Sequence, residues 1–124
     1  MRITIPCFGD QHRDGVRQRA SALDEKFDGI VERIEVEPRR HNIFAQWGSR
    51  LHVTLSTHID TVPPFFTSRE DGENIWGRGA CDTKGIIAAM LKAAEALLAA
   101  GERDFGMLFV VGEERNSAGA YRAA

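Results

Sequence analysis

The sequence lacks the features that mark disulfide-rich, membrane-spanning and secreted proteins. Its 124 residues include two cysteines, Cys7 and Cys81, which lie far apart. Such a pair is not a disulfide framework and favours free thiols in a reducing cytoplasm. No apolar run approaches the ~18 residues of a membrane span, and the opening MRITIPCFGDQHR is too poor in apolar residues for a secretory signal. We therefore expect a cytoplasmic protein with no membrane partner.

Strong net charge is also missing. The formal charge is −2, which gives no reason to expect nucleic acid or an acidic membrane surface as a partner. With 43% hydrophobic and 27% charged residues, the composition is that of a globular protein. The length is typical of one domain, so residues 1–124 are treated as a single unit.

Alternating apolar residues predict strands in the first half of the chain. Residues 30–36 (IVERIEV) and 42–47 (NIFAQW) are predicted to form a strand pair around a short loop, and residues 51–57 (LHVTLST) a further strand. Residues 63–79 are rich in proline, glycine and acidic residues, which favours a long loop with a short strand at NIWG.

One helix and one buried strand are predicted in the second half. Residues 82–101 (DTKGIIAAMLKAAEALLAAG) have Asp82 at the expected start, Gly101 at the expected C-terminal cap, and an apolar stripe of Ile86, Met90, Ala94, Leu97 and Leu98. The unbroken apolar run 107–111 (MLFVV) is typical of a strand buried on both faces. This order predicts an α/β fold with a parallel strand–helix–strand unit.

Acidic residues and one histidine follow the predicted strands. His58 and Asp60 end one strand, Glu113 and Glu114 end another, and Asp82 opens the helix between them. Ligands of such sheets bind beyond the carboxyl ends of the strands. An imidazole with several carboxylates suits zinc and related divalent ions. Asp60 could then orient the ring of His58, while one of the paired glutamates binds metal and the other acts as a general base.

Simpler interpretations of the same residues exist. His58 could be a hydrogen-bonded strand-end histidine, Asp82 a helix N-cap, and Glu113 and Glu114 a solvated pair at a strand end. Cys81 is interpreted as a small packing residue, because no second cysteine lies near it.

Three segments in this order, STHIDTVPP, GRGACDTKGIIAAML and LFVVGEERNSAGA, resemble the M20 metallopeptidase family. The resemblance implies a zinc-exopeptidase-like three-layer α/β sandwich with a mixed, partly parallel sheet. It also implies metal ligands at His58, Asp82 and Glu114, with Asp82 bridging two ions, Glu113 as the catalytic base and Asp60 supporting His58.

The same resemblance implies a cofactor and a reaction. Two Zn²⁺ ions would occupy the complete site, with Co²⁺ or Mn²⁺ as alternatives. The reaction would be hydrolysis of an amide bond in a small N-acyl amino acid or short peptide, as in deacylases and carboxypeptidases. A homodimer is an open alternative for the full-length form.

The chain also departs from the family pattern. Residues 1–29 diverge from the usual opening, residues 115–124 (RNSAGAYRAA) contain no further Asp, Glu or His ligand, and the lid or dimerisation domain has no counterpart. We therefore expect a truncated first portion of a catalytic domain, inactive by itself. The alternatives are a catalytically inactive remnant, a weak metal-binding module, or a dizinc aminopeptidase of the M28 type, against which GRGACDTKG argues.

Overall fold

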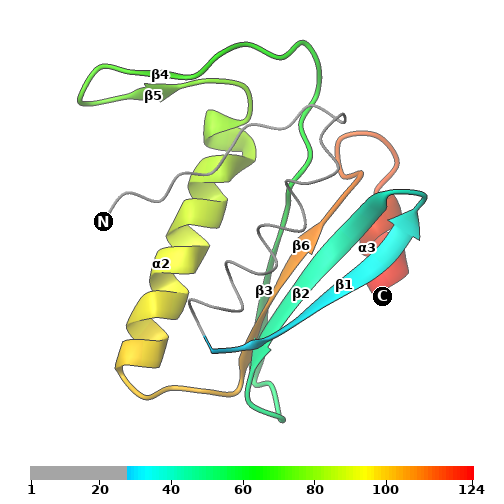
Figure 1. Ribbon diagram of the computed structural model, residues 1–124, viewed down its shortest axis with the longest axis vertical. Helices are drawn as coiled ribbons and strands as arrows, with labels where there is room; N and C mark the ends of the chain where they lie inside the picture. Colours follow the sequence, from blue (N-terminus) through cyan, green and yellow to red (C-terminus); the bar gives the residue numbers. More distant parts are fainter. Residues whose placement is uncertain (1–27) are drawn as a thin grey trace.

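The computed structural model describes residues 28–124, in which a four-stranded mixed sheet is the central element (Figure 1). The predicted N-terminal segment therefore lies almost wholly outside the described residues. The strand order is β1-β2-β6-β3. The strands span Ile30–Glu37 (β1), Arg40–Trp47 (β2), Val53–His58 (β3) and Phe105–Val110 (β6). All four predicted strand segments are confirmed, whereas the insertion of β6 between β2 and β3 could not be read from the order of the chain.

The pairing of the strands explains the mixed character of the sheet. β1 pairs with β2 and β2 with β6 in antiparallel fashion, as expected for a hairpin and its neighbour. β3 and β6 are parallel, and the helix α2 (Ile86–Ala99) connects them. The predicted parallel strand–helix–strand unit is thus confirmed.

The core lies between α2 and one face of the sheet, where the alternating residues of the central strands point. It consists of Ile43, Ala45, Trp47, Met90, Ala94, Phe105, Met107 and Phe109. The short helix α3 (Ala118–Ala123) contacts β1, β2 and β6. Asn42, which neighbours Ile43 and therefore points to the opposite face, bonds to Gly119 in α3. Helices thus cover both faces of the sheet, and the predicted three-layer α/β architecture is confirmed (Figure 1).

The start of the main helix differs from the prediction. An irregular helical turn, η1 (Ala80–Gly85), precedes α2, and Asp82 has the non-helical backbone angles φ −110° and ψ 93°. Asp82 is therefore not the N-cap; Gly85 occupies that position. Ile86 is 49% exposed and lies outside the apolar stripe, which is formed instead by Ile87, Met90, Leu91, Ala94, Leu97 and Leu98.

The end of α2 agrees with the prediction in detail. Gly101 has φ +80°, a conformation that glycine adopts without a steric cost. Its N–H donates to the carbonyl of Leu98, and the N–H of Glu102 donates to the carbonyl of Leu97. These two bonds are the Schellman arrangement that satisfies carbonyls at a helix C-terminus.

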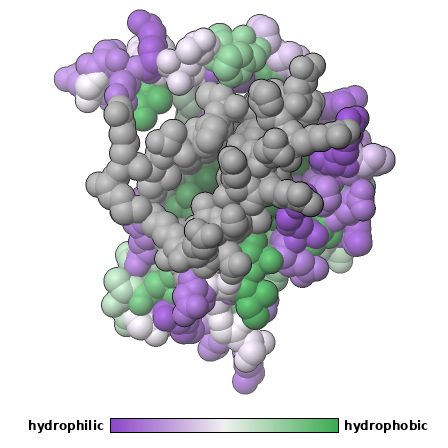
Figure 2. All heavy atoms as spheres, viewed as in Figure 1, coloured by the Kyte–Doolittle hydropathy of each residue, from purple (hydrophilic) through white to green (hydrophobic). Residues whose placement is uncertain are grey.

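The long loop predicted before the helix contains a small second sheet. β4 (Arg69–Glu70) and β5 (Ile75–Trp76) form a two-stranded hairpin, which refines the single NIWG strand expected there. Large apolar side chains on this part of the chain are about half exposed or more, at Phe65, Phe66, Ile75 and Trp76. Figure 2 shows hydrophobic surface at the top of the molecule, where this loop and hairpin lie.

Two further observations bear on the predictions from composition. Cys81 is a free and exposed thiol rather than a packing residue, while Cys7 lies outside the described residues. Within residues 28–124, no helix is both long and apolar enough to cross a membrane.

Candidate metal centre

The candidate site lies at the carboxyl ends of the two parallel strands. His58 at the end of β3 is in register with Val110 at the end of β6. The N–H of Ile59 still donates to the carbonyl of Val110 at 2.9 Å, so the two chains stay side by side as they leave the sheet. Because parallel strands end at the same edge, His58 and the glutamates after β6 are brought together there.

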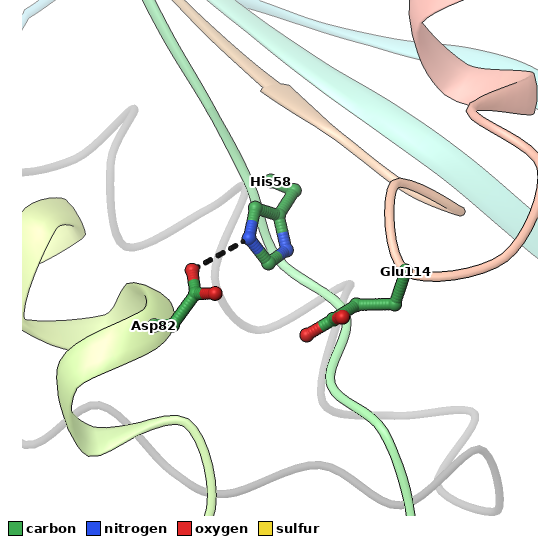
Figure 3. Close-up of side chains that lie close together, drawn as sticks. All are labelled: His58, Asp82 and Glu114. Atoms are coloured by element: carbon green, nitrogen blue, oxygen red, sulfur yellow. Dashed lines mark hydrogen bonds and ion pairs between the residues drawn. The ribbon is translucent and has the colours of Figure 1, made fainter.

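Asp82 reaches the same edge from η1. Its Oδ1 lies 2.9 Å from Nε2 of His58, as the dashed line in Figure 3 marks. The following residue, Thr83, is 1% exposed, and its Oγ1 lies 2.8 Å from the Oγ1 of Thr57 on β3. This hydroxyl pair joins the turn to the strand directly beside His58. The peptide bond between Asp82 and Thr83 is cis.

Glu114 completes a group of three potential ligands. One atom each from His58, Asp82 and Glu114 lies within 4.8 Å of the other two. In Figure 3, the Glu114 side chain extends from the loop after β6 toward His58. The imidazole is buried, whereas the Asp82 side chain is 72% exposed. The group is therefore anchored at the sheet and open toward solvent.

Asp60 connects the histidine to the glutamate loop. Its Oδ1 lies 3.5 Å from Nδ1 of His58 and accepts the backbone N–H of Glu113 at 3.3 Å. Its other oxygen accepts the N–H of Glu114 at 3.4 Å. Arg40 on β2 lies 4.0 Å from the same oxygen. The backbone carbonyl of Asp60 lies closer still to Nδ1 of His58, at 3.2 Å, so Asp60 lies between the imidazole and the glutamate loop.

Glu113 lies beside the three grouped residues. Its Oε2 is 3.8 Å from Nε2 of His58, and its side chain is 53% exposed. Burial lowers the pKa of His58, but the hydrogen bond to Asp82 and the charges of Asp82, Glu113 and Asp60 together raise it above the ordinary value. The carboxylates around the imidazole therefore make this edge attractive to positive charge.

The five residues singled out from the sequence all meet at this edge: His58, Asp60, Asp82, Glu113 and Glu114. Three supporting residues, Arg40, Asn42 and Thr83, were not predicted. Arg40 falls in the predicted short loop and Asn42 is a polar residue of a predicted strand, and both patterns ordinarily indicate a solvent-facing side chain. Only their contacts in the folded chain reveal that they support the site.

Comparison with known proteins shows which family the sequence around this site matches. Residues 54–124, which include His58, Asp60, Asp82, Glu113 and Glu114, match the model of peptidase family M20/M25/M40. The chain belongs to this peptidase family. The match favours the M20 assignment over the M28 alternative and confirms the resemblance read from the three sequence segments.

The names of individual relatives agree with the match to this peptidase family. A peptidase M20 domain-containing protein of Schizosaccharomyces pombe is 41% identical over 95 residues, covering 72% of this chain and 24% of that protein. A probable carboxypeptidase of Emericella nidulans is 38% identical over 128 residues, covering 94% of this chain and 30% of that protein. The chain thus spans about a quarter to a third of the length of these curated relatives.

A solved structure shares the fold. The crystal structure of human carnosine dipeptidase 1 matches with a TM-score of 0.62 and 20% sequence identity. The match covers 78% of this chain and 25% of the dipeptidase chain. This likeness supports the α/β architecture described above for the M20 peptidase chain.

The donor set of the site fits the divalent metals that the family uses. An imidazole nitrogen and carboxylate oxygens are ordinary zinc ligands, and His58, Asp82 and Glu114 supply both types within 4.8 Å. Two more carboxylates, from Asp60 and Glu113, surround the same imidazole. A divalent cation would balance this concentration of negative charge, so the residues present fit the implied group.

Proposed function

We propose that the full-length protein is a zinc-dependent hydrolase that cleaves an amide bond in a small N-acyl amino acid or a short peptide. The single observation that carries the proposal is the convergence of His58, Asp82 and Glu114 within 4.8 Å at the carboxyl edge of the sheet. The names of the relatives, which include probable carboxypeptidases, support a peptide or amino-acid substrate.

The proposal gives each residue of the site a role. His58, Asp82 and Glu114 would hold the metal. Zn²⁺ is the proposed ion, with Co²⁺ or Mn²⁺ as alternatives. When bound, such an ion acts as a Lewis acid toward water and the scissile carbonyl. Asp60 would keep Nε2 of His58 directed at the site, through its backbone carbonyl 3.2 Å from Nδ1 and its carboxylate 3.5 Å from the same atom.

Glu113 is proposed as the general base and acid. Its carboxylate is 3.8 Å from Nε2 of His58 and more than half exposed, so it can contact a substrate that enters from solvent. It would accept a proton from the attacking water and deliver that proton to the nitrogen of the leaving amine. Asp60 fixes the Glu113 backbone N–H, which limits where the carboxylate can reach.

A hydrolysis assay on the full-length protein tests the proposal. The substrates are N-acetyl amino acids, dipeptides, and dipeptides blocked at either the amino or the carboxyl end. We expect hydrolysis that requires a free substrate carboxylate, stops after chelation and returns when Zn²⁺ or Co²⁺ is added back. Activity that survives chelation would contradict the proposal. Metal binding without hydrolysis of any member of the panel would instead favour the metal-binding module.

A further inference from the structure

We infer that Asn42 is a positioning residue for the glutamate loop, residues 112–117, which carries Glu113 and Glu114. The inference deepens the proposed function and rests on it for the role of these two glutamates. Asn42 lies on β2, outside the residues 54–124 that match the family model. It is fully buried, with 0% of its surface exposed.

Both polar groups of the Asn42 side chain bond to the ends of the glutamate loop. Its Oδ1 accepts the backbone N–H of Val111 at 3.1 Å, just before the loop. Its Nδ2 donates to the carbonyl of Gly119 at 2.7 Å, just after the loop. A third bond, from the N–H of Gly119 to the carbonyl of Val111 at 2.8 Å, closes the same base. The side chain therefore holds the beginning and end of the loop together.

The chemistry of the position requires a carboxamide. One partner is an N–H donor and the other a carbonyl acceptor, so the side chain must accept at one atom and donate at another. An aspartate could not donate to Gly119, and an apolar residue would leave both buried backbone groups without this partner. Gly119 packs closely against the same groups, because a Cβ there would lie 2.3 Å from the carbonyl oxygen of Val111 and 2.6 Å from Oδ1 of Asn42.

The loop is held at its two sides by different residues. Asn42 fixes its base from the face of the sheet opposite α2, while Asp60 accepts the N–H groups of Glu113 and Glu114 at its far side. Only Gly112 separates Val111 from Glu113. Movement at the base therefore changes the direction in which both glutamate side chains leave the loop, and with it the distance from Glu114 to His58.

The test compares Co²⁺ affinity and the Co²⁺ absorption spectrum among variants of the full-length protein. The variants are Asn42→Ala, Glu114→Gln, the double variant that carries both, and Met90→Ala. Met90 is a buried core residue of α2, so its truncation controls for loss of stability away from the loop. We expect Asn42→Ala to weaken Co²⁺ binding by about 10–100-fold and to change the spectrum, as loss of an outer supporting residue does. Met90→Ala should change neither.

The double variant decides whether Asn42 acts through the glutamate. In the Glu114→Gln background, Asn42→Ala should weaken binding by less than about twofold, because the group it positions is already lost. An equal loss in both backgrounds, or no loss in either, would overturn the inference. If Asn42→Ala does not fold, Asn42→Asp keeps the shape of the side chain and an acceptor for Val111 but cannot donate to Gly119, and it should give the same Glu114-dependent loss.

A second readout separates this inference from the proposed function. If the unsubstituted protein binds no Co²⁺, the metal site fails, and backbone amide NMR shifts and hydrogen exchange of residues 112–117 then decide the role of Asn42. Larger changes at these amides in Asn42→Ala than in Met90→Ala would support the positioning role. Equal changes in the two variants would refute it.

Discussion

Replacement of Asp60 by alanine should weaken metal binding without unfolding the protein. The Asp60 carboxylate is 3.5 Å from Nδ1 of His58 and accepts the backbone N–H groups of Glu113 and Glu114. It therefore holds the loop that carries Glu114, one proposed ligand, and lies beside His58, a second. The backbone carbonyl of Asp60, 3.2 Å from Nδ1 of His58, stays in place in the variant, so the effect is expected mainly through the loop. Loss of such an outer partner typically lowers metal affinity about 10–100-fold, which corresponds to roughly 1.4–2.8 kcal/mol of binding free energy.

The expected effect of Asp60→Ala on stability is smaller. The two bonds it accepts are long, at 3.3 and 3.4 Å, and Glu113 is exposed, so water can replace part of what is lost. Each bond then contributes near the lower end of the usual range, about 0.5 kcal/mol. Urea unfolding of the metal-free protein measures this free energy, and competition with a chromophoric chelator measures the Co²⁺ affinity.

Glu37→Ala provides a matched control for this prediction. Glu37 bonds to Arg40 at 2.7 Å, and Arg40 lies 4.0 Å from Asp60. The variant therefore removes a carboxylate that is connected to Asp60 only through Arg40, and leaves the carboxylates beside His58 in place. We expect its Co²⁺ affinity to stay within about twofold of the unsubstituted protein, since no ligand or ligand partner is lost. If Asp60→Ala also stayed within that range, the proposed support of His58 and the glutamate loop would be refuted.

Three further predictions concern His58, Thr83 and Met107. Because the pKa of His58 is raised in the fold, its contribution to stability is present below about pH 6.5 and is lost as the pH rises through the raised value. Urea unfolding of the metal-free protein should therefore show a falling free energy of unfolding from about pH 6 to 8. His58→Asn should flatten that slope. Thr83→Val removes the hydroxyl pair with Thr57, so it should lower the free energy of unfolding in urea by roughly 0.5–1.5 kcal/mol. It should also weaken Co²⁺ binding, because Thr83 holds the turn that carries Asp82. An unchanged Co²⁺ affinity would show that the position of Asp82 does not depend on this hydroxyl pair. Met107→Ala opens a cavity at a fully buried position of β6 and should lower the free energy of unfolding by about 2–5 kcal/mol. The Co²⁺ affinity of the folded protein should stay unchanged. A large loss of affinity would mean that the site depends on the whole core.

Much of the site was predictable because its residues come directly after predictable strands. Two apolar segments ending in His58-x-Asp60 and Glu113-Glu114 imply parallel strand ends, and parallel strands bring the residues after them to one edge of the sheet. The helix between them was evident from its composition and its terminal Gly101. The sequence therefore predicts which side chains meet without any knowledge of the distances between them.

The parts that were missed depend on contacts that local pattern does not encode. Asp82 has the residue type and place of a helix N-cap, yet buried Thr83 bonds to β3 and holds a non-helical turn there. Asn42 has the pattern of a solvent-facing residue in a strand, yet α3 folds over it and buries it. In both cases the deciding partner is distant in the sequence, 26 residues away for Thr83 and 77 for Asn42.

The most direct test of the proposed metal centre is the Zn²⁺ affinity of Glu113→Gln and Glu114→Gln, measured side by side in the full-length protein. The two residues are adjacent and chemically identical, and the substitutions are isosteric, so only their places in the site differ. We predict at least about a tenfold loss of affinity for Glu114→Gln, because a ligand should matter no less than its outer partners. Glu113→Gln should keep its affinity within about twofold while losing roughly 10²–10⁴-fold in hydrolysis. Equal losses of Zn²⁺ affinity in the two variants, or the reverse order, would contradict the assigned roles.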